Sequence, residues 1–272
     1  MLGQDVARAA QRAAHEAIAL DRSALDVTDP GSVRAALRSA RPDVVVNCAA
    51  FTDVDGAEAH EREATAVNAT GAGAVARCAH ELGAWTIHIS TDYVFDGTAR
   101  QAYVESDPTA PASAYGRSKL AGEREVAAGA PDAHTIVRTS WLFGLGGRCF
   151  PATIRRLCQE RDEITVVDDQ VGCPTFTGHL ASALMHLADT RPRGVVHLAG
   201  AGSCSWYEFA RAIVAGVGGD CEVLPCTTAQ FPRPAPRPAF SVLGTDRADE
   251  LTPMPSWQDG LSAYLSAEVA RA

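Results

Sequence analysis

The chain has 272 residues, of which 46% are hydrophobic and 21% are charged, and its formal net charge is −9. The acidic balance and the scattered arginines exclude a surface that neutralises nucleic-acid phosphates, and no apolar run approaches the roughly 20 residues of a membrane span. We therefore expect a cytoplasmic protein with enough volume for a large buried core, which binds neither nucleic acid nor membrane.

Helical and strand-like segments alternate along the chain. The expected helices cover residues 2–14, 32–40, 61–82, 114–127, 150–160 and 177–188. The expected strands cover residues 17–20, 43–47, 85–90, 134–138, 164–167 and 194–198. Such alternation predicts parallel strands joined by right-handed crossovers, and apolar runs without polar breaks are typical of strands covered on both faces. The fold class is therefore α/β, with a doubly wound parallel sheet of the Rossmann type.

We expect two parts. Residues 1–144 and 162–200 form the Rossmann-like, dinucleotide-binding domain. Residues 145–161 and 201–272 form a smaller C-terminal substrate-binding lobe, entered through a proline-rich stretch at 226–238. Ligands of doubly wound folds bind beyond the carboxyl ends of the strands, so this edge is where a site is expected.

Tyr115 and Lys119 are the first candidates for chemistry. Lys119 is the only lysine in a chain rich in arginine, and Tyr115 lies four residues before it, on the same side of the expected helix. A nearby ammonium favours phenolate, lowers the pKa of the tyrosine and makes proton exchange with a ketone oxygen feasible. Arginine is a poor substitute because its charge is spread over a broad fork. The alternative is a chance pair of surface residues.

Thr91 follows an apolar strand directly and is expected at the carboxyl edge of the sheet. Its hydroxyl could donate a hydrogen bond to the carbonyl oxygen that Tyr115 protonates. A turn at Asp96-Gly97 also fits this stretch, but it leaves the run of polar groups before it unexplained.

Seven runs, taken together and in order, resemble the dTDP-4-dehydrorhamnose reductase family of extended short-chain dehydrogenases. They cover residues 49–55, 90–97, 115–119, 138–141, 169–175, 205–210 and 237–243. The resemblance implies hydride transfer from NADPH, with NADH tolerated, to C4 of dTDP-4-dehydro-L-rhamnose, giving dTDP-L-rhamnose.

The resemblance also implies residue roles. Tyr115 would protonate the nascent alkoxide, Lys119 would hold the nicotinamide ribose and tune the tyrosine, and Thr91 would bind the carbonyl oxygen. Asp92 and Trp141 would join Thr91 in contacting the sugar. The cofactor would contact Gly3, Asp21, Asp26, Val27, Ala50, Phe51, Thr52, Ile89, Tyr115 and Lys119. Asp21 suits a free ribose hydroxyl, whereas the adjacent Arg22 could pair with a 2′-phosphate.

Several alternatives stay open. Asp26 could be a turn or helix cap, and Trp141 a core aromatic. The chain could reduce another nucleotide deoxysugar in secondary metabolism, or it could be a non-catalytic regulatory subunit of the same fold. No C-x-x-C pair or carboxylate cluster requires a metal, so the need for Mg²⁺ stays open, as does the choice between monomer and homodimer.

The start of the chain departs from the family. The family opens with a strand and a glycine-rich turn, of which Met1-Leu2-Gly3 supplies only the tail. That strand lies in the middle of a doubly wound sheet, and the turn approaches the cofactor pyrophosphate. We therefore expect the first strand to be absent from this sequence and the true start to lie upstream.

Overall fold

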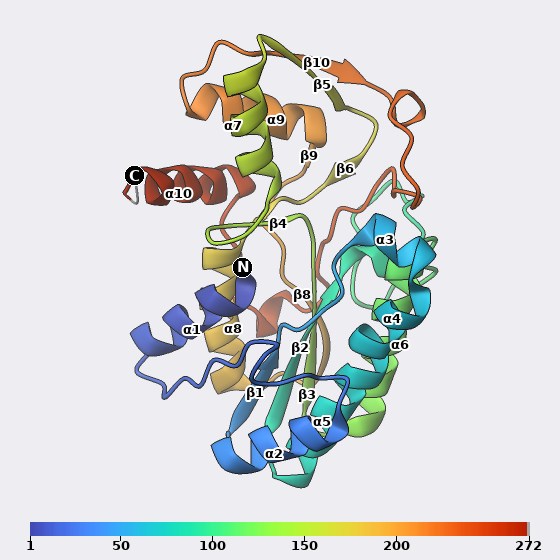
Figure 1. The fold of residues 1–272 in the computed structure, drawn as a ribbon, viewed down its shortest axis with the longest axis vertical. Helices are drawn as coiled ribbons and strands as arrows, with labels where there is room; N and C mark the ends of the chain where they lie inside the picture. Colours follow the sequence, from blue (N-terminus) through green and yellow to red (C-terminus); the bar gives the residue numbers. More distant parts are fainter. Residues whose placement is uncertain (271–272) are drawn as a thin grey trace.

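Four parallel strands form the central sheet of the computed structural model, which describes residues 1–270 (Figure 1). In spatial order they are β1 (Val44–Asn47), β2 (Trp85–Thr91), β3 (His134–Thr139) and β8 (Gly194–His197). All three neighbouring pairs are parallel. The predicted α/β fold with a parallel, Rossmann-like sheet is therefore confirmed.

Helices cover both faces of this sheet (Figure 1). One face carries α1 (Leu2–Arg12) and α8 (Thr177–Thr190), whose apolar side chains pack on Ile87, Val137 and Val196 of the strands. The other face carries α2 (Pro30–Ala40), α5 (Ala72–Glu81) and α6 (Ala114–Gly129). The burial of each strand on both sides explains why the strands read as unbroken apolar runs.

A second hydrophobic core lies beyond the carboxyl end of the sheet (Figure 1). Phe143, Phe209 and Tyr264 are its largest fully buried residues. The helices around it are α7 (Phe150–Glu160), α9 (Trp206–Gly216) and α10 (Trp257–Val269). Its strand pairs are β5 (Glu163–Val167) with β10 (Glu222–Cys226), β4 (Leu142–Phe143) with β7 (Thr175–Phe176), and β6 (Val171–Gly172) with β9 (Cys204–Ser205).

The prediction of a strand at residues 17–20 is wrong. This segment follows α1 as an irregular stretch, and Ile18 and Leu20 are 56% and 42% exposed. A strand needs a neighbour to take its backbone hydrogen bonds, and among residues 1–270 no strand pairs with the outer edge of β1. The segment therefore has the apolar composition of a strand, but it forms none because it has no strand to pair with among residues 1–270.

The helix expected at 61–82 is interrupted. It consists of α4 (Glu61–Thr65), a π-helical turn (Ala66–Gly71) and α5. A π-turn inserts an extra residue in the helix and is frequent at functional sites. Here it contains Asn68, which is completely buried against α6.

The remaining elements are short. They are α3 (Val54–Ala59) and the 3-10 helices Asp92–Val94, Thr228–Gln230 and Ala248–Glu250. No helix among the described residues is long and apolar enough to span a bilayer.

Candidate active site

Three strand ends bring the predicted catalytic residues to one edge of the sheet. Thr91 is the last residue of β2 and is paired with Thr139, the last residue of β3. Asn47 ends β1 and is paired with His88. Helix α6 crosses beside them and carries Tyr115 in its first turn and Lys119 one turn later.

Two glycines allow α6 to lie this close. A Cβ on Gly116 would stand 2.2 Å from the carbonyl oxygen of Tyr93, and one on Gly122 would stand 2.0 Å from that of Asn68. The helix begins with a cap in which the Gly116 N–H donates to the Ser113 hydroxyl over 3.1 Å. Its position is thus set by backbone contacts at both glycines, and larger residues there would push Tyr115 and Lys119 away from the strands.

Tyr115 lies beside Thr91. Burial raises the pKa of the phenol to about 12, opposed by a hydrogen bond with the Thr91 side chain. The ring of Tyr93 packs edge-on against it, with centroids 5.6 Å apart. The predicted lowering of the Tyr115 pKa by Lys119 is therefore wrong for this structure, because desolvation of the phenol outweighs the other effects. A neutral phenol is the form that can donate a proton.

Lys119 is 1% exposed, and its ammonium-bearing end points into the sheet edge. Its Nζ donates to the carbonyl oxygen of Ile89 over 2.6 Å and lies 3.3 Å from Nε2 of His88. Desolvation lowers the pKa of Lys119 to about 8, against the opposing charge of Glu123. The side chain of Lys119 is thus held by the Ile89 carbonyl and the His88 ring, two contacts that the residues around Lys119 in the sequence do not predict.

We expect Lys119→Arg to lower kcat by at least about 100-fold, because a guanidinium fork cannot make these two close contacts in a space filled by an amine. The measurement is kcat at saturating substrate and cofactor, together with a thermal unfolding curve. A variant that unfolds like the parent and keeps kcat within about threefold would contradict the assigned position of Lys119.

Asp92 lies under Thr91, whose hydroxyl donates to Asp92 Oδ1 over 3.0 Å. The carboxyl group is 2% exposed, and this burial raises its pKa to about 6. Among the described residues, Asp92 Oδ2 and the hydroxyls of Thr139 and Ser241 are buried without a hydrogen-bond partner. Buried polar groups are normally satisfied, and the Ser241 hydroxyl does face Asp92, where it partly offsets the effect of burial on the pKa of that carboxyl group.

Trp141 adopts a conformation that is rare for a residue other than glycine, with φ at +45°. Its half-buried indole stacks on Trp206 with a centroid distance of 3.6 Å and an interplanar angle of 6°. Gly172 leaves room for this indole, since a Cβ there would lie 2.5 Å from the ring. Strain of this kind often accompanies function, and here it fixes the orientation of a flat aromatic surface near β3.

The predicted cofactor residues fall into two groups. Gly3 lies at the start of α1. A Cβ placed on Gly3 would stand 3.7 Å from Cβ of Cys48, so the N-terminus of this helix adjoins the end of β1. Phe51 is fixed there by Asn68, whose Oδ1 accepts from the Phe51 N–H over 2.8 Å. Ala50 and Thr52 flank it, and Ile89 supplies the carbonyl that Lys119 binds.

The other group, at residues 21–27, makes contacts mainly with residues close to it in the sequence. Asp21 is exposed and accepts from Ser23, while Asp26 accepts from the N–H and hydroxyl of Thr28, as a turn cap does. Val27 is buried among the apolar residues of α2 and α5. The structure does not bring these three residues to the Tyr115 edge.

A helix N-terminus beside the strand ends is a suitable place for the diphosphate of a dinucleotide, and the Tyr115–Lys119 end of the edge suits a reactive ring. The residues present therefore fit a nicotinamide cofactor. Among residues 1–270 no group of three His, Cys, Asp or Glu side chains could hold a metal ion.

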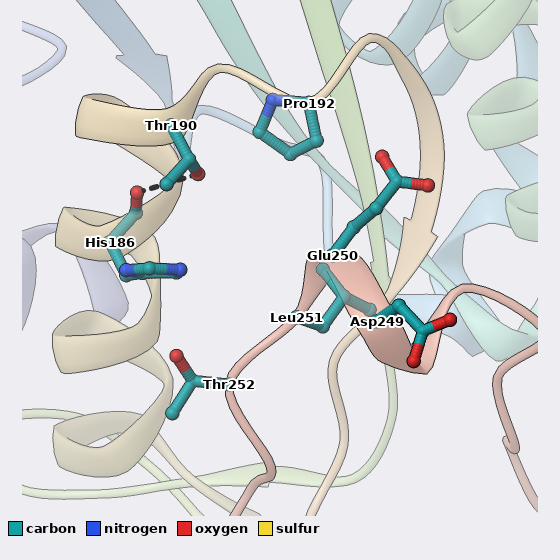
Figure 2. A pocket seen from close by; sticks show the side chains of 7 residues that line it. All are labelled: His186, Thr190, Pro192, Asp249, Glu250, Leu251 and Thr252. Atoms are coloured by element: carbon teal, nitrogen blue, oxygen red, sulfur yellow. Dashed lines mark hydrogen bonds between the residues drawn. The ribbon is translucent and has the colours of Figure 1, made fainter.

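One open hollow lies elsewhere in the molecule. It measures about 340 Å³ and lies at the amino end of β8, between the end of α8 and residues 249–252 (Figure 2). Its walls are polar and open, and none of the candidate catalytic residues lines it. A much smaller hollow, about 30 Å³, is lined by Tyr93, Ser113 and Arg237 next to Tyr115.

Sequence reasoning missed five residues that complete the site. They are Asn68, His88, Tyr93, Trp206 and Ser241. His88 and Tyr93 lie within or beside the quoted runs, whereas Asn68 depends on a π-turn that the sequence pattern did not reveal.

Comparisons with known proteins point to the same family of reductases that the sequence resembles. The chain matches the family model "RmlD substrate binding domain" over residues 1–269. It is 45% identical to the dTDP-4-dehydrorhamnose reductase of Mycobacterium tuberculosis (strain CDC 1551 / Oshkosh), over 98% of this chain and 90% of the relative. A probable dTDP-4,6-dihydroxy-2-methyloxan-3-one 4-ketoreductase from Streptomyces antibioticus is 43% identical, over 96% and 90%. The dTDP-4-dehydrorhamnose reductase of Bacillus anthracis, solved in complex with NADP, superposes with a TM-score of 0.95 at 37% identity, covering 98% of this chain and 95% of that one.

Proposed function

Because the chain belongs to the dTDP-4-dehydrorhamnose reductase family, we propose that it reduces the C4 keto group of dTDP-4-dehydro-L-rhamnose with a reduced nicotinamide cofactor, giving dTDP-L-rhamnose. The observation that carries this proposal is the placement of the Thr91 hydroxyl beside the neutral phenol of the half-buried Tyr115. Two neighbouring O–H groups can stabilise the negative charge that develops on a ketone oxygen during reduction, one by hydrogen bonding and the other by giving up its proton.

The chemistry follows from these groups. The cofactor supplies the hydride that forms the new C–H bond at C4. The Tyr115 phenol gives its proton to the oxygen, which becomes the hydroxyl of the product, while the Thr91 hydroxyl turns its single proton from Asp92 to the same oxygen. Before substrate binds, Asp92 accepts the Thr91 hydroxyl proton over 3.0 Å, and Trp141, held against Trp206, would contact the sugar through the part of its indole that stays exposed.

For the cofactor we propose NADPH. The support is the relative solved with NADP, together with Arg22, which follows Asp21 and could pair with a 2′-phosphate. NADH would be tolerated. Whether Mg²⁺ contributes is a question for the assay, which can be run with a chelator.

We also propose that the two parts of the chain bind different ligands. Residues 1–144 and 162–200 would bind the dinucleotide, and residues 145–161 and 201–272 the sugar nucleotide. The separate hydrophobic core around Phe143, Phe209 and Tyr264 supports a second part, although β5, within 162–200, pairs with β10 of that part. We place the protein in the cytoplasm, as a monomer or homodimer.

A second candidate function is the reduction of another dTDP-linked 4-keto sugar, which the relative from Streptomyces antibioticus favours. A purely regulatory role is less well supported, since a scaffold would have no need of Thr91, Tyr115 and Lys119 together. The test is an assay with a panel of dTDP-4-keto-6-deoxysugars and NADPH, with product stereochemistry assigned by NMR. Preference for dTDP-4-dehydro-L-rhamnose supports the proposal; preference for another sugar favours the second candidate; no turnover of any substrate would contradict both.

A further inference from the structure

A chain of buried polar groups runs from the backbone of Ala49 to Lys119. The Ala49 N–H donates to Oδ1 of Asn47 over 3.1 Å. The amide nitrogen of Asn47 lies 3.3 Å from Nδ1 of His88, and Nε2 of His88 lies 3.3 Å from Nζ of Lys119. Asn47, His88 and Lys119 are 6%, 0% and 1% exposed, so water competes little for these groups, whose other recorded partners are the Ala49 N–H and the Ile89 carbonyl.

The donor-to-acceptor direction of these hydrogen bonds is fixed by the backbone N–H of Ala49. A backbone N–H can only donate, so Asn47 must turn its oxygen toward Ala49 and its NH₂ group toward His88. Nδ1 of His88 is then an acceptor, and the single proton of a neutral imidazole stands on Nε2. Burial keeps the ring neutral, since it lowers the pKa of His88 well below its ordinary value.

The Nε2–H group consequently points at Nζ of Lys119 and needs an acceptor there. An amine has a lone pair and can accept, whereas an ammonium carries only donors. Either form can donate to the Ile89 carbonyl. All groups of the chain are therefore satisfied together only when Lys119 is a neutral amine.

The ammonium form loses one hydrogen bond. To accept from it, His88 must move its proton to Nδ1, where it faces the NH₂ group of Asn47, or Asn47 must also turn and face the Ala49 N–H with a donor. The other groups around Lys119 do not remove this conflict. Glu123, on the same helix, favours the ammonium but is engaged by Arg138 and Ser90. Cys48, after β1, stays a neutral thiol because burial raises its pKa to about 12.

We propose that Asn47 and His88 are positioning residues for Lys119, which fix the place of its side-chain nitrogen, favour its neutral amine form and make any proton it takes up easy to release. The consequence for turnover rests on the proposed function. When Tyr115 has given its proton to the ketone oxygen, the phenolate must regain one. A Lys119 nitrogen that releases its proton readily, and is left as the amine that His88 stabilises, can take part in this return of a proton from solvent.

The test uses the fact that Lys119 is the only lysine in the chain. Protein labelled with ¹³Cε-lysine gives one resonance, whose titration reports the protonation of Lys119 directly. The ¹⁵N shifts of the His88 ring, assigned by comparison with His88→Gln, report which nitrogen carries the proton. The informative variant is Asn47→Asp, because a carboxylate can accept from both the Ala49 N–H and Nδ1–H of His88.

In the parent protein we expect His88 protonated on Nε2 and a Lys119 midpoint of about 8. In Asn47→Asp we expect the ring proton on Nδ1 and the midpoint moved up toward the ordinary 10.5. A parent ring protonated on Nδ1, a parent midpoint at 10.5 or above, or an Asn47→Asp variant with unchanged tautomer would each overturn the proposal. None of these readings involves a substrate, so an error in the proposed function would appear in the turnover assay and leave them unaffected.

Discussion

Tyr115→Phe should lower kcat by about two to four orders of magnitude, the usual span for a lost general acid. The phenol interacts with the Thr91 side chain, and its pKa of about 12 keeps it protonated at neutral pH. The ring itself packs against Tyr93, and phenylalanine keeps that contact, so folding should change little. The measurement is kcat under saturating conditions, with circular dichroism and thermal unfolding to check the fold.

Tyr264→Phe is the matched control. Tyr264 lies on α10, fully buried in the second hydrophobic core, where its ring packs edge-on against Phe143. It should retain the activity of the parent. A Tyr115→Phe variant as active as Tyr264→Phe would exclude Tyr115 as the proton donor.

Glu123→Gln should lower the free energy of unfolding by about 3–5 kcal/mol, the range for breaking a buried ion pair on one side. Glu123 accepts from Nε and Nη2 of Arg138 over 2.9 and 2.8 Å, and from the Ser90 hydroxyl over 2.5 Å. Both charged side chains are 6% exposed or less. The amide would place a donor against Arg138 and leave its charge uncompensated inside the protein. Denaturant unfolding at neutral pH measures the effect.

The control for this prediction lies on the same helix. Glu125 pairs with Arg77 over 3.1 Å, but both side chains are nearly half exposed. Solvent screens such a pair, so Glu125→Gln should change the free energy of unfolding by less than about 1 kcal/mol. Equal losses in the two variants would show that the Arg138–Glu123 pair is not the buried one that the structure describes.

The parts of the fold that sequence predicted correctly are those set by local pattern. The apolar runs at 43–47 and 85–90 became β1 and β2, because a strand covered on both faces has no polar break. Thr91, Tyr115 and Lys119 could be named because their chemistry and spacing are visible in the chain. The failure at 17–20 has a different origin: its apolar residues match a strand, but pairing depends on a neighbour that residues 1–270 do not provide beside β1.

The parts that could not be predicted depend on contacts between distant residues. Nothing near Lys119 in the sequence indicates that His88, 31 positions earlier, contacts it, or that Asn47, 72 positions earlier, contacts His88. Both contacts depend on how the strands are paired. The sign of the Tyr115 pKa shift depends on how deeply the phenol is buried, which no spacing reveals. Trp141 required both its positive φ and Trp206, from a later helix, before its orientation was fixed.

The central claim is tested most directly by a single turnover of dTDP-4-dehydro-L-rhamnose with NADPH carrying deuterium at the nicotinamide C4. The account predicts deuterium at C4 of the sugar and oxidation of one cofactor per ketone reduced, with both rates lowered together in Tyr115→Phe. Cofactor oxidation without label at the sugar C4, or equal rates in the parent and Tyr115→Phe, would contradict it.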